Sequence, residues 1–219
     1  MARQVGRRDG ERPLGSLTLP RPGRHPLWVT LRRLPGLCAL LALVLAASPA
    51  LATVTTALDL RELVTRADLV TVATALHRES RWDARRRIVT DVTLRVDQVF
   101  KGEGREGSEI VVRRLGGAIG DLGMQVAGAP SFEDGQRSLI FAERRGGHLR
   151  AVGMSQGVMR IRVDLQGREL VLPGGSGLSL VRRVPGGALT EAPAALLAPR
   201  PLGDLLDEVR RTVDETRGN

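Results

Sequence analysis

The sequence predicts a mainly β fold, a small β-barrel or sandwich with a short helix near its N-terminus and a second helix at its C-terminus. Residues 88–102 read IVTDVTLRVDQVFKG, with β-branched or apolar residues at every second position from Ile88 to Val96. Such alternation is typical of a long strand with one buried and one exposed face. Shorter strand-like segments lie around it between glycine-rich turns, and a segment of helical periodicity flanks them on each side.

Composition and periodicity divide the chain into parts. The expected parts are a leader extension that is disordered or reflects a mis-assigned translation start (1–28), a secretory signal peptide (29–52), a β-rich domain (53–172), a linker rich in glycine, proline and alanine (173–201) and an amphipathic helix (202–219). The first part lacks hydrophobic periodicity, and segments of that kind cannot bury enough apolar surface to fold.

The segment 29–52 has the regions of a signal peptide. Arg32 and Arg33 precede an apolar run over 37–47, and small residues close the segment. The run is short for a membrane span and Pro49 follows it, so cleavage is favoured over the alternative of an uncleaved anchor. The predicted cleavage-site residues are Ala50, Ala52 and Thr53, with the cut between the last two. The processed chain is therefore predicted to be secreted or periplasmic, without a stable membrane span.

Most of the net charge of +9 belongs to the leader. Residues 1–52 carry eight arginines and two acidic residues, which leaves 25 basic and 22 acidic residues in the rest of the chain. Aromatic residues make up 2% of the chain and tyrosine is absent, so the stacking surfaces of single-strand binders are missing. We therefore expect no nucleic-acid partner. Cys38, the only cysteine, lies in the leader, so the processed domain is predicted to lack disulfides and thiolate metal sites.

Hydrophobic periodicity predicts both helices. Leu60, Leu63, Val64 and Ala67 fall on one face of a helix over 58–67. At the other end, a helix over 202–216 carries one apolar stripe, which consists of Leu202, Leu205, Leu206, Val209 and Val213.

Short apolar or alternating segments between turns predict the strands. The expected strands cover 69–76, 88–102, 108–115, 138–142, 148–153, 156–163 and 168–172, with a further short strand around 124–126. The expected connections include a polar hairpin loop over 77–87, a turn over 132–137 and an irregular segment over 173–201.

The long strand over 88–102 changes parity near its end. Gln98 falls where the buried face should continue, and the apolar Val99 takes the opposite parity. One extra residue in this strand would restore the pattern. We therefore predict a β-bulge at Asp97–Gln98 that curls the sheet toward closure, whereas an uninterrupted ladder would count against a barrel.

The segment 153–157 matches the G-x-S-x-G motif of serine hydrolases, but its surroundings do not. The motif, Gly153-Met154-Ser155-Gln156-Gly157, needs a helix after it and a histidine later in the chain. A strand pattern follows instead, and no histidine comes after His148. We interpret the segment as glycines flanking a β-bulge and disfavour a serine hydrolase.

A glycine-dense loop is the candidate ligand-binding segment. Its named residues are Gly116, Gly117, Gly120, Gly123 and Pro130. Neither the helix start nor the Lys-Ser/Thr pair that a phosphate cradle needs follows these glycines, so a phosphate-binding loop of that kind is not expected. Loops held by a rigid scaffold are nevertheless where binding residues concentrate.

Two motifs together resemble a pattern found in bacterial exported proteins of unknown function. Residues 66–72 read RADLVTV and residues 92–102 read VTLRVDQVFKG, similar to A-D-x-V followed by V-x-V-x-x-V-x-K-G. The same residues are more distantly similar to netrin-like domains, which are OB-type barrels. The resemblance covers about residues 58–142 and implies an OB/netrin-like barrel. It implies no inhibitory activity, because netrin-like inhibitors act through an N-terminal cysteine that the processed chain lacks.

The sequence favours an exported, non-enzymatic β-module that binds a protein or a cell-envelope component. His77 and His148 are not spaced as metal ligands, and no paired carboxylates suggest acid–base chemistry, so no catalytic residue, metal or cofactor is expected. The alternative is a secreted enzyme of an unrecognised type. The oligomeric state stays open.

Overall fold

A computed structural model describes residues 53–175, 178–183, 186–193, 196 and 198–218. They belong to one compact unit that begins at Leu51. The predicted signal peptide, with Ala50 and Ala52, lies outside the described residues. Among the described residues, no helix combines the length and the apolarity that crossing a membrane requires. With a single cysteine in the sequence, an intrachain disulfide cannot form.

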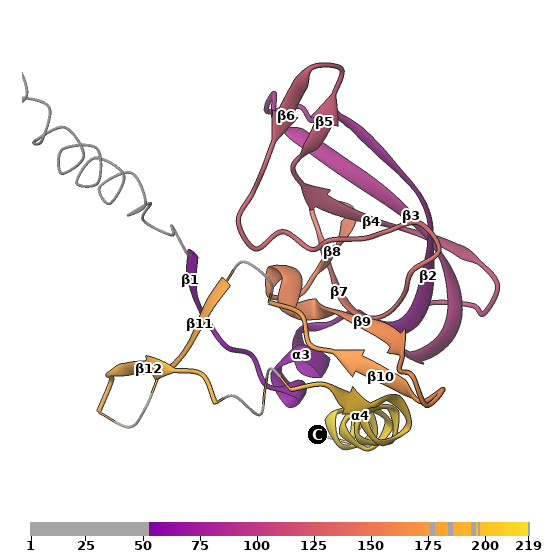
Figure 1. Ribbon diagram of the computed structural model, residues 1–219, viewed down its shortest axis with the longest axis vertical. Coiled ribbons are helices and arrows are strands. Elements are labelled where there is room, and N and C mark those ends of the chain that lie inside the picture. Colours follow the sequence, from indigo (N-terminus) through magenta and orange to yellow (C-terminus); the bar gives the residue numbers. More distant parts are fainter. Residues whose placement is uncertain (1–52, 176–177, 184–185, 194–195, 197, 219) are drawn as a thin grey trace, which may run out of the picture. The chain divides into compact units, whose positions relative to one another are not determined.

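The described part is mainly β, with a short helix near its start and a longer helix at its end (Figure 1). The elements are β1 (Thr53–Thr56), α3 (Leu60–Arg66), β2 (Leu69–Trp82), β3 (Ile88–Lys101), β4 (Glu109–Leu115), β5 (Gly117–Ile119), β6 (Leu122–Met124), β7 (Arg137–Arg145), β8 (His148–Ala151), the 3-10 helix η1 (Met154–Gly157), β9 (Val158–Val163), β10 (Glu169–Leu172), β11 (Leu178–Arg183), β12 (Leu189–Glu191), β13 (Arg200–Pro201) and α4 (Leu202–Arg217).

The largest sheet has eight strands in the order β13-β10-β9-β7-β2-β3-β4-β8, and β7 also pairs with β8. The pairings therefore run in a circuit from β2 through β3, β4, β8 and β7 back to β2. All of these pairs are antiparallel except β4 with β8, which is parallel and rests on one residue pair, Val112 with Leu149. We call the line along which β4 and β8 meet and then diverge the seam.

The predicted bulge at Asp97–Gln98 is confirmed. The ladder between β2 and β3 pairs Val72 with Gln98 and Ala73 with Val96, so Asp97 is skipped. The ladder has two further irregularities, one between Val70 and Thr71 and the other between Ala75 and His77 of β2. Because each extra residue bends its strand and increases the local twist, these irregularities help the long β2–β3 pair to curl.

Two apolar clusters lie on opposite faces of the sheet. One joins α3 and α4 to the sheet through Val72 and Phe141, and the other lies on the opposite face and contains Leu94 and Ile140. The helix predicted over 202–216 is confirmed, and every residue of its predicted stripe is buried. The helix predicted over 58–67 is also confirmed: Asp59 accepts from the Glu62 backbone, and the Glu62 side chain accepts from the Asp59 backbone, which stabilises the start of α3.

The polar hairpin loop predicted over 77–87 is wrong, because β2 continues to Trp82 and pairs there with Ile88. The turn is confined to the next few residues, where the Asp83 carboxylate accepts from the backbone N–H groups of Arg85 and Arg87, each at 2.9 Å. The end of β2 is largely exposed on both faces, so it lacks the alternation by which a half-buried strand is recognised.

The irregular segment predicted over 173–201 is also wrong. Its described residues include β11, β12 and β13, and β11 pairs in parallel with β1 from the start of the domain. Residues 116–130 hold the β5–β6 hairpin in place of the single predicted strand around 124–126. These strands are two to six residues long and their partners are set by the fold, so local periodicity carries little information about them.

The residues Phe100 and Lys101 tie the end of β3 to both helices. Phe100 packs in the cluster beneath α4, and the Arg210 guanidinium lies 5.3 Å from its ring centre. The Lys101 ammonium donates to the Val64 carbonyl oxygen at 2.7 Å, at the C-terminal end of α3. Carbonyl groups at a helix C-terminus lack partners within the helix, so a cation there is favourable.

Replacing Lys101 with methionine is expected to lower the free energy of unfolding by about 1 kcal/mol, because the apolar stem stays and only the charged donor is lost. Urea denaturation of both proteins measures the difference. Arg105→Met, which removes a positive charge from the exposed turn after β3, is the control and should leave stability unchanged. Equal losses in both variants would contradict the capping role.

Candidate functional site

A pocket of about 330 Å³ opens at the seam, where β4 and β8 diverge beyond their single pair. Residues from β4, β7, β8, α3 and the loop before β7 line it. Its charged side chains are Arg66, Arg113, Arg114, Arg145, Arg150 and Glu143. We call it the arginine pocket. Five guanidinium groups around one carboxylate give it a strongly positive character.

Carboxylates neutralise part of this charge. Asp91 accepts two hydrogen bonds from Arg113, from Nε at 2.6 Å and from Nη2 at 2.8 Å. Glu143 forms an ion pair with Arg145 at 3.0 Å. The two-bond arrangement fixes the plane of the Arg113 guanidinium, whereas the more exposed Glu143–Arg145 pair contributes less to stability.

Arg114 and Arg150 differ from the paired arginines because their side chains have no partner among the described residues. The side chain of neither forms a hydrogen bond or an ion pair within the described part of the chain, and the Nε atom of each is buried without a partner. An arginine guanidinium stays charged at neutral pH, so a buried N–H that lacks an acceptor costs free energy. Both side chains line the pocket, so an anion bound there would supply acceptors to guanidinium groups that lack them.

The alternation of β4 explains the position of Arg114. It falls on the same face as Val112, which is fully buried, and pairs across the ladder with Thr90, which is 2% exposed. Burial lowers the pKa of the Arg114 guanidinium, and the nearby charge of Arg78 lowers it further. A charged residue therefore occupies a position where the strand pattern calls for an apolar one, which is typical of functional sites.

Arg150 approaches from β8 on the other side of the seam. It pairs across the ladder with Glu143, but that carboxylate forms its ion pair with Arg145. Leu149 and Ala151, the neighbours of Arg150 on the strand, pack against the cluster around Leu94. Because successive side chains alternate, Arg150 lies on the opposite face of β8 from those two residues.

The ion pair at Asp91 makes stability depend on pH. The hydrogen bonds from Arg113, opposed by partial burial, lower the Asp91 pKa below its ordinary value of 3.8, and Arg81 lowers it further. A lowered pKa in the folded state means that this stabilisation is complete above the unfolded-state pKa and is lost as the pH falls through the folded-state value.

Asp91→Asn is therefore expected to destabilise the protein by a constant amount at neutral pH, and the difference from the native chain should shrink below about pH 4. Urea denaturation over a pH series measures it. Asp121→Asn, in the exposed turn between β5 and β6, is the matched control. A difference that stays the same down to the most acidic pH would contradict the assignment.

Of the five residues named in the predicted glycine-dense loop, Pro130 lines the pocket and the four glycines do not, although Val126 and Ala129 of the same loop also line it. A Cβ at Gly116 would lie 2.6 Å from the Met124 carbonyl oxygen, and one at Gly117 would lie 2.3 Å from Thr90 Oγ1. These two glycines permit close packing, while Gly120 forms the β5–β6 turn and Gly123 lies in β6. Ligand binding by the loop remains a prediction.

The β-bulge predicted around Ser155 is wrong, because Ser155 lies in η1, a 3-10 helix. Its Oγ atom is buried and has no hydrogen-bond partner within the described residues. Gly153, at φ +60°, begins this helix, and Gly174 approaches so closely that a Cβ there would lie 1.8 Å from the Ser155 carbonyl oxygen. The segment forms a buried turn and does not present its hydroxyl as a nucleophile elbow does.

The five arginines were not predicted as a site. Arg113 and Arg114 were assigned only to a strand, and Arg150 lies in another strand more than thirty residues away. The one available signal was the series Ile110, Val112, Arg114, in which a charged residue follows two apolar residues on the same face of the strand. Among the described residues, no cluster of three or more histidine, cysteine, aspartate or glutamate side chains could hold a metal ion.

No protein-family model matches the chain, and no curated protein matches it.

Proposed function

We propose that this chain is an exported, non-enzymatic β-module whose arginine pocket holds a carboxylate or phosphate group of a protein or cell-envelope component. The observation that carries the proposal is the pair Arg114 and Arg150, each with a buried Nε atom that lacks an acceptor. Planar guanidinium groups bind carboxylates and phosphates through two parallel hydrogen bonds, so two of them facing one pocket suit such an anion.

We further propose that the strand circuit is a small barrel of the OB or netrin-like type. Five strands whose pairings return to the first strand support this, as do the bulges in the β2–β3 pair. The single β4–β8 pair makes the seam the weakest part of the circuit and leaves room there for a ligand.

Export is proposed from the leader. The basic segment, the apolar run and the small residues before Thr53 support cleavage by a signal peptidase. The resemblance to exported bacterial proteins, centred on the motif at Phe100–Gly102, supports the same location. The mass of the protein recovered from the periplasm or medium of an expressing bacterium tests this, and a chain that begins at Thr53 is the expected product.

Calorimetric titration of the purified protein at low ionic strength tests the binding proposal, with succinate and inorganic phosphate as probes. We expect binding that Arg114→Met and Arg150→Met each weaken at least about tenfold, since each removes one charged hydrogen-bonding partner. Arg105→Met is the charge-matched control. Equal binding by all variants, or no binding by the native chain, would overturn the proposal, and turnover of an ester or peptide substrate would favour the enzyme alternative.

A further inference from the structure

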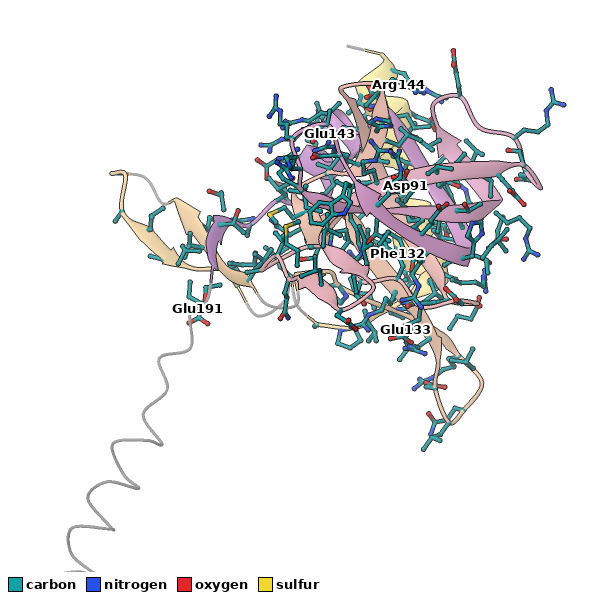
Figure 2. All side chains as sticks on the ribbon, turned by 90° about the horizontal axis from the view of Figure 1, so that it is seen from above. Asp91, Phe132, Glu133, Glu143, Arg144 and Glu191 are labelled. Atoms are coloured by element: carbon teal, nitrogen blue, oxygen red, sulfur yellow. The ribbon has the colours of Figure 1, made fainter. Side chains whose placement is uncertain are left out.

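A second hollow adjoins the arginine pocket and shares Arg113 with it. This outer hollow has a volume of about 400 Å³ and is lined by β4 residues from before and after Val112 and by His148 and Leu149 of β8. The two hollows therefore follow the seam, one on each side of Arg113. Figure 2 shows Asp91 and Arg144 of the outer hollow and Glu143 of the arginine pocket in the same region of the molecule. We call the combined feature the seam groove.

Positive charge predominates along the whole seam groove. Its arginines are Arg66, Arg81, Arg113, Arg114, Arg144, Arg145 and Arg150, and its carboxylates are Asp91 and Glu143. Seven guanidinium groups against these two carboxylates and Glu62, which pairs with Arg66 at 3.6 Å, leave an excess of four positive charges. The positive charge is spread over a length of the surface and is not confined to the arginine pocket, so it suits a ligand with several negative charges along a chain.

The edge of β4 offers main-chain hydrogen bonds in the same place. β4 pairs with β3 along all of its residues from Glu109 to Leu115, but with β8 at Val112 alone. Arg114 and Leu115 continue past that pair with no strand partner on the β8 side in the described part. A strand edge of this kind is where an extended peptide can add as a further strand.

The walls of the seam groove distinguish a peptide from other polyanions. Leu115, Val126, Val152 and Met154 line the arginine pocket, and Met154 is 36% exposed. These apolar surfaces suit side chains of a peptide. No phenylalanine, tyrosine or tryptophan lines either hollow, so the stacking partners that sugars and nucleobases use are missing there.

We infer that the seam groove binds an extended acidic segment of a partner protein, which adds along the free edge of β4 and places a carboxylate at Arg114. This inference rests on the proposed anion site and specifies its ligand. The acidic side chains on one face of the added strand meet Arg114, and the apolar side chains on the other face contact Leu115 and Met154, in keeping with the alternation of a strand.

Fluorescence anisotropy of a labelled peptide of alternating glutamate and valine, about eight residues long to match a strand, tests the inference. We expect it to bind, and we expect at least about a tenfold loss for the glutamine–valine counterpart and for the same acidic peptide methylated on alternate backbone amides. The first change removes charge, and the second removes main-chain donors while keeping charge. A methylated peptide that binds as well as the parent would overturn strand addition.

The variant Arg144→Met separates the seam groove from the arginine pocket. Arg144 lines the outer hollow only, so its replacement is expected to weaken peptide binding about threefold more than it weakens phosphate binding. If phosphate and succinate bind at Arg114 but the acidic peptide does not, the inference fails and the proposed function stands. If none of these probes binds, both fail. Polyphosphate that competes as strongly as the peptide would also overturn the choice of a peptide ligand.

Discussion

Replacing Arg114 with methionine is expected to raise the free energy of unfolding by about 1–2 kcal/mol while it weakens anion binding at least about tenfold. The Arg114 Nε atom is buried without an acceptor, and its neighbours on the same face of β4 are apolar. Methionine keeps most of the stem and removes the unpaired charge. Thermal or urea denaturation gives the change in stability, and titration with succinate gives the change in binding.

Because Arg114→Met is expected to raise stability and to weaken binding, it is a stringent test of function. A structural arginine loses stability when it is replaced, because its partners are left unpaired. Arg113→Met is the comparison within the same strand: Asp91 holds Arg113 through two hydrogen bonds, so its loss should destabilise the protein. If Arg114→Met is instead destabilising to a similar degree, Arg114 has a structural role and the binding proposal loses its main support. Polar groups that are kept for a ligand commonly lower stability, so replacing them raises stability and weakens function.

Replacing Gly102 with alanine is expected to lower the free energy of unfolding by about 3 kcal/mol. Gly102 has φ +88°, a conformation that alanine adopts only with strain, and a Cβ there would lie 1.9 Å from the Asp68 carbonyl oxygen. That oxygen belongs to the backbone and cannot move without shifting the start of β2. The end of β3 and the start of β2 would therefore separate.

Gly107→Ala is the matched control, because Gly107 has φ +80° but no atom within 4 Å of an added Cβ. Its free energy of unfolding should fall only by the cost of the strained backbone conformation, about 1 kcal/mol. The difference between the two variants then isolates the clash with Asp68. Urea denaturation measures both, and equal losses would show that the contact between β3 and β2 tolerates the methyl group.

Some elements could be predicted because one local pattern decided them. The face of β3 from Ile88 to Val96 and the stripe of α4 are buried as their periods of two and 3.6 residues require. The parity change at Gln98 gave the bulge, because an extra residue is the simplest way to return Val99 to its cluster. In each case the burial of one face overrides other influences.

Other elements depend on contacts between distant segments, which no local pattern encodes. The end of β2 near Trp82 is exposed on both faces, and β1 finds its parallel partner β11 more than a hundred residues later. The arginine pocket is assembled in the same way, because Arg114 and Arg150 come to line one pocket only through the β4–β8 pair. The sequence shows that a charged residue interrupts the apolar face of a strand. The fold decides which other charged residues line the same pocket.

The chain contains a single lysine, and this has a practical consequence for chemical labelling. Reagents that acylate primary amines can react at Lys101 and at the α-amino group. The Lys101 amine donates to the Val64 carbonyl oxygen, so a reagent must compete with the end of α3 to reach it. At neutral pH the lower pKa of an α-amino group directs the reaction to the N-terminus. A fluorophore or a surface can thus be attached at one defined end, while the rate of modification at Lys101 reports how often its amine releases the Val64 carbonyl oxygen.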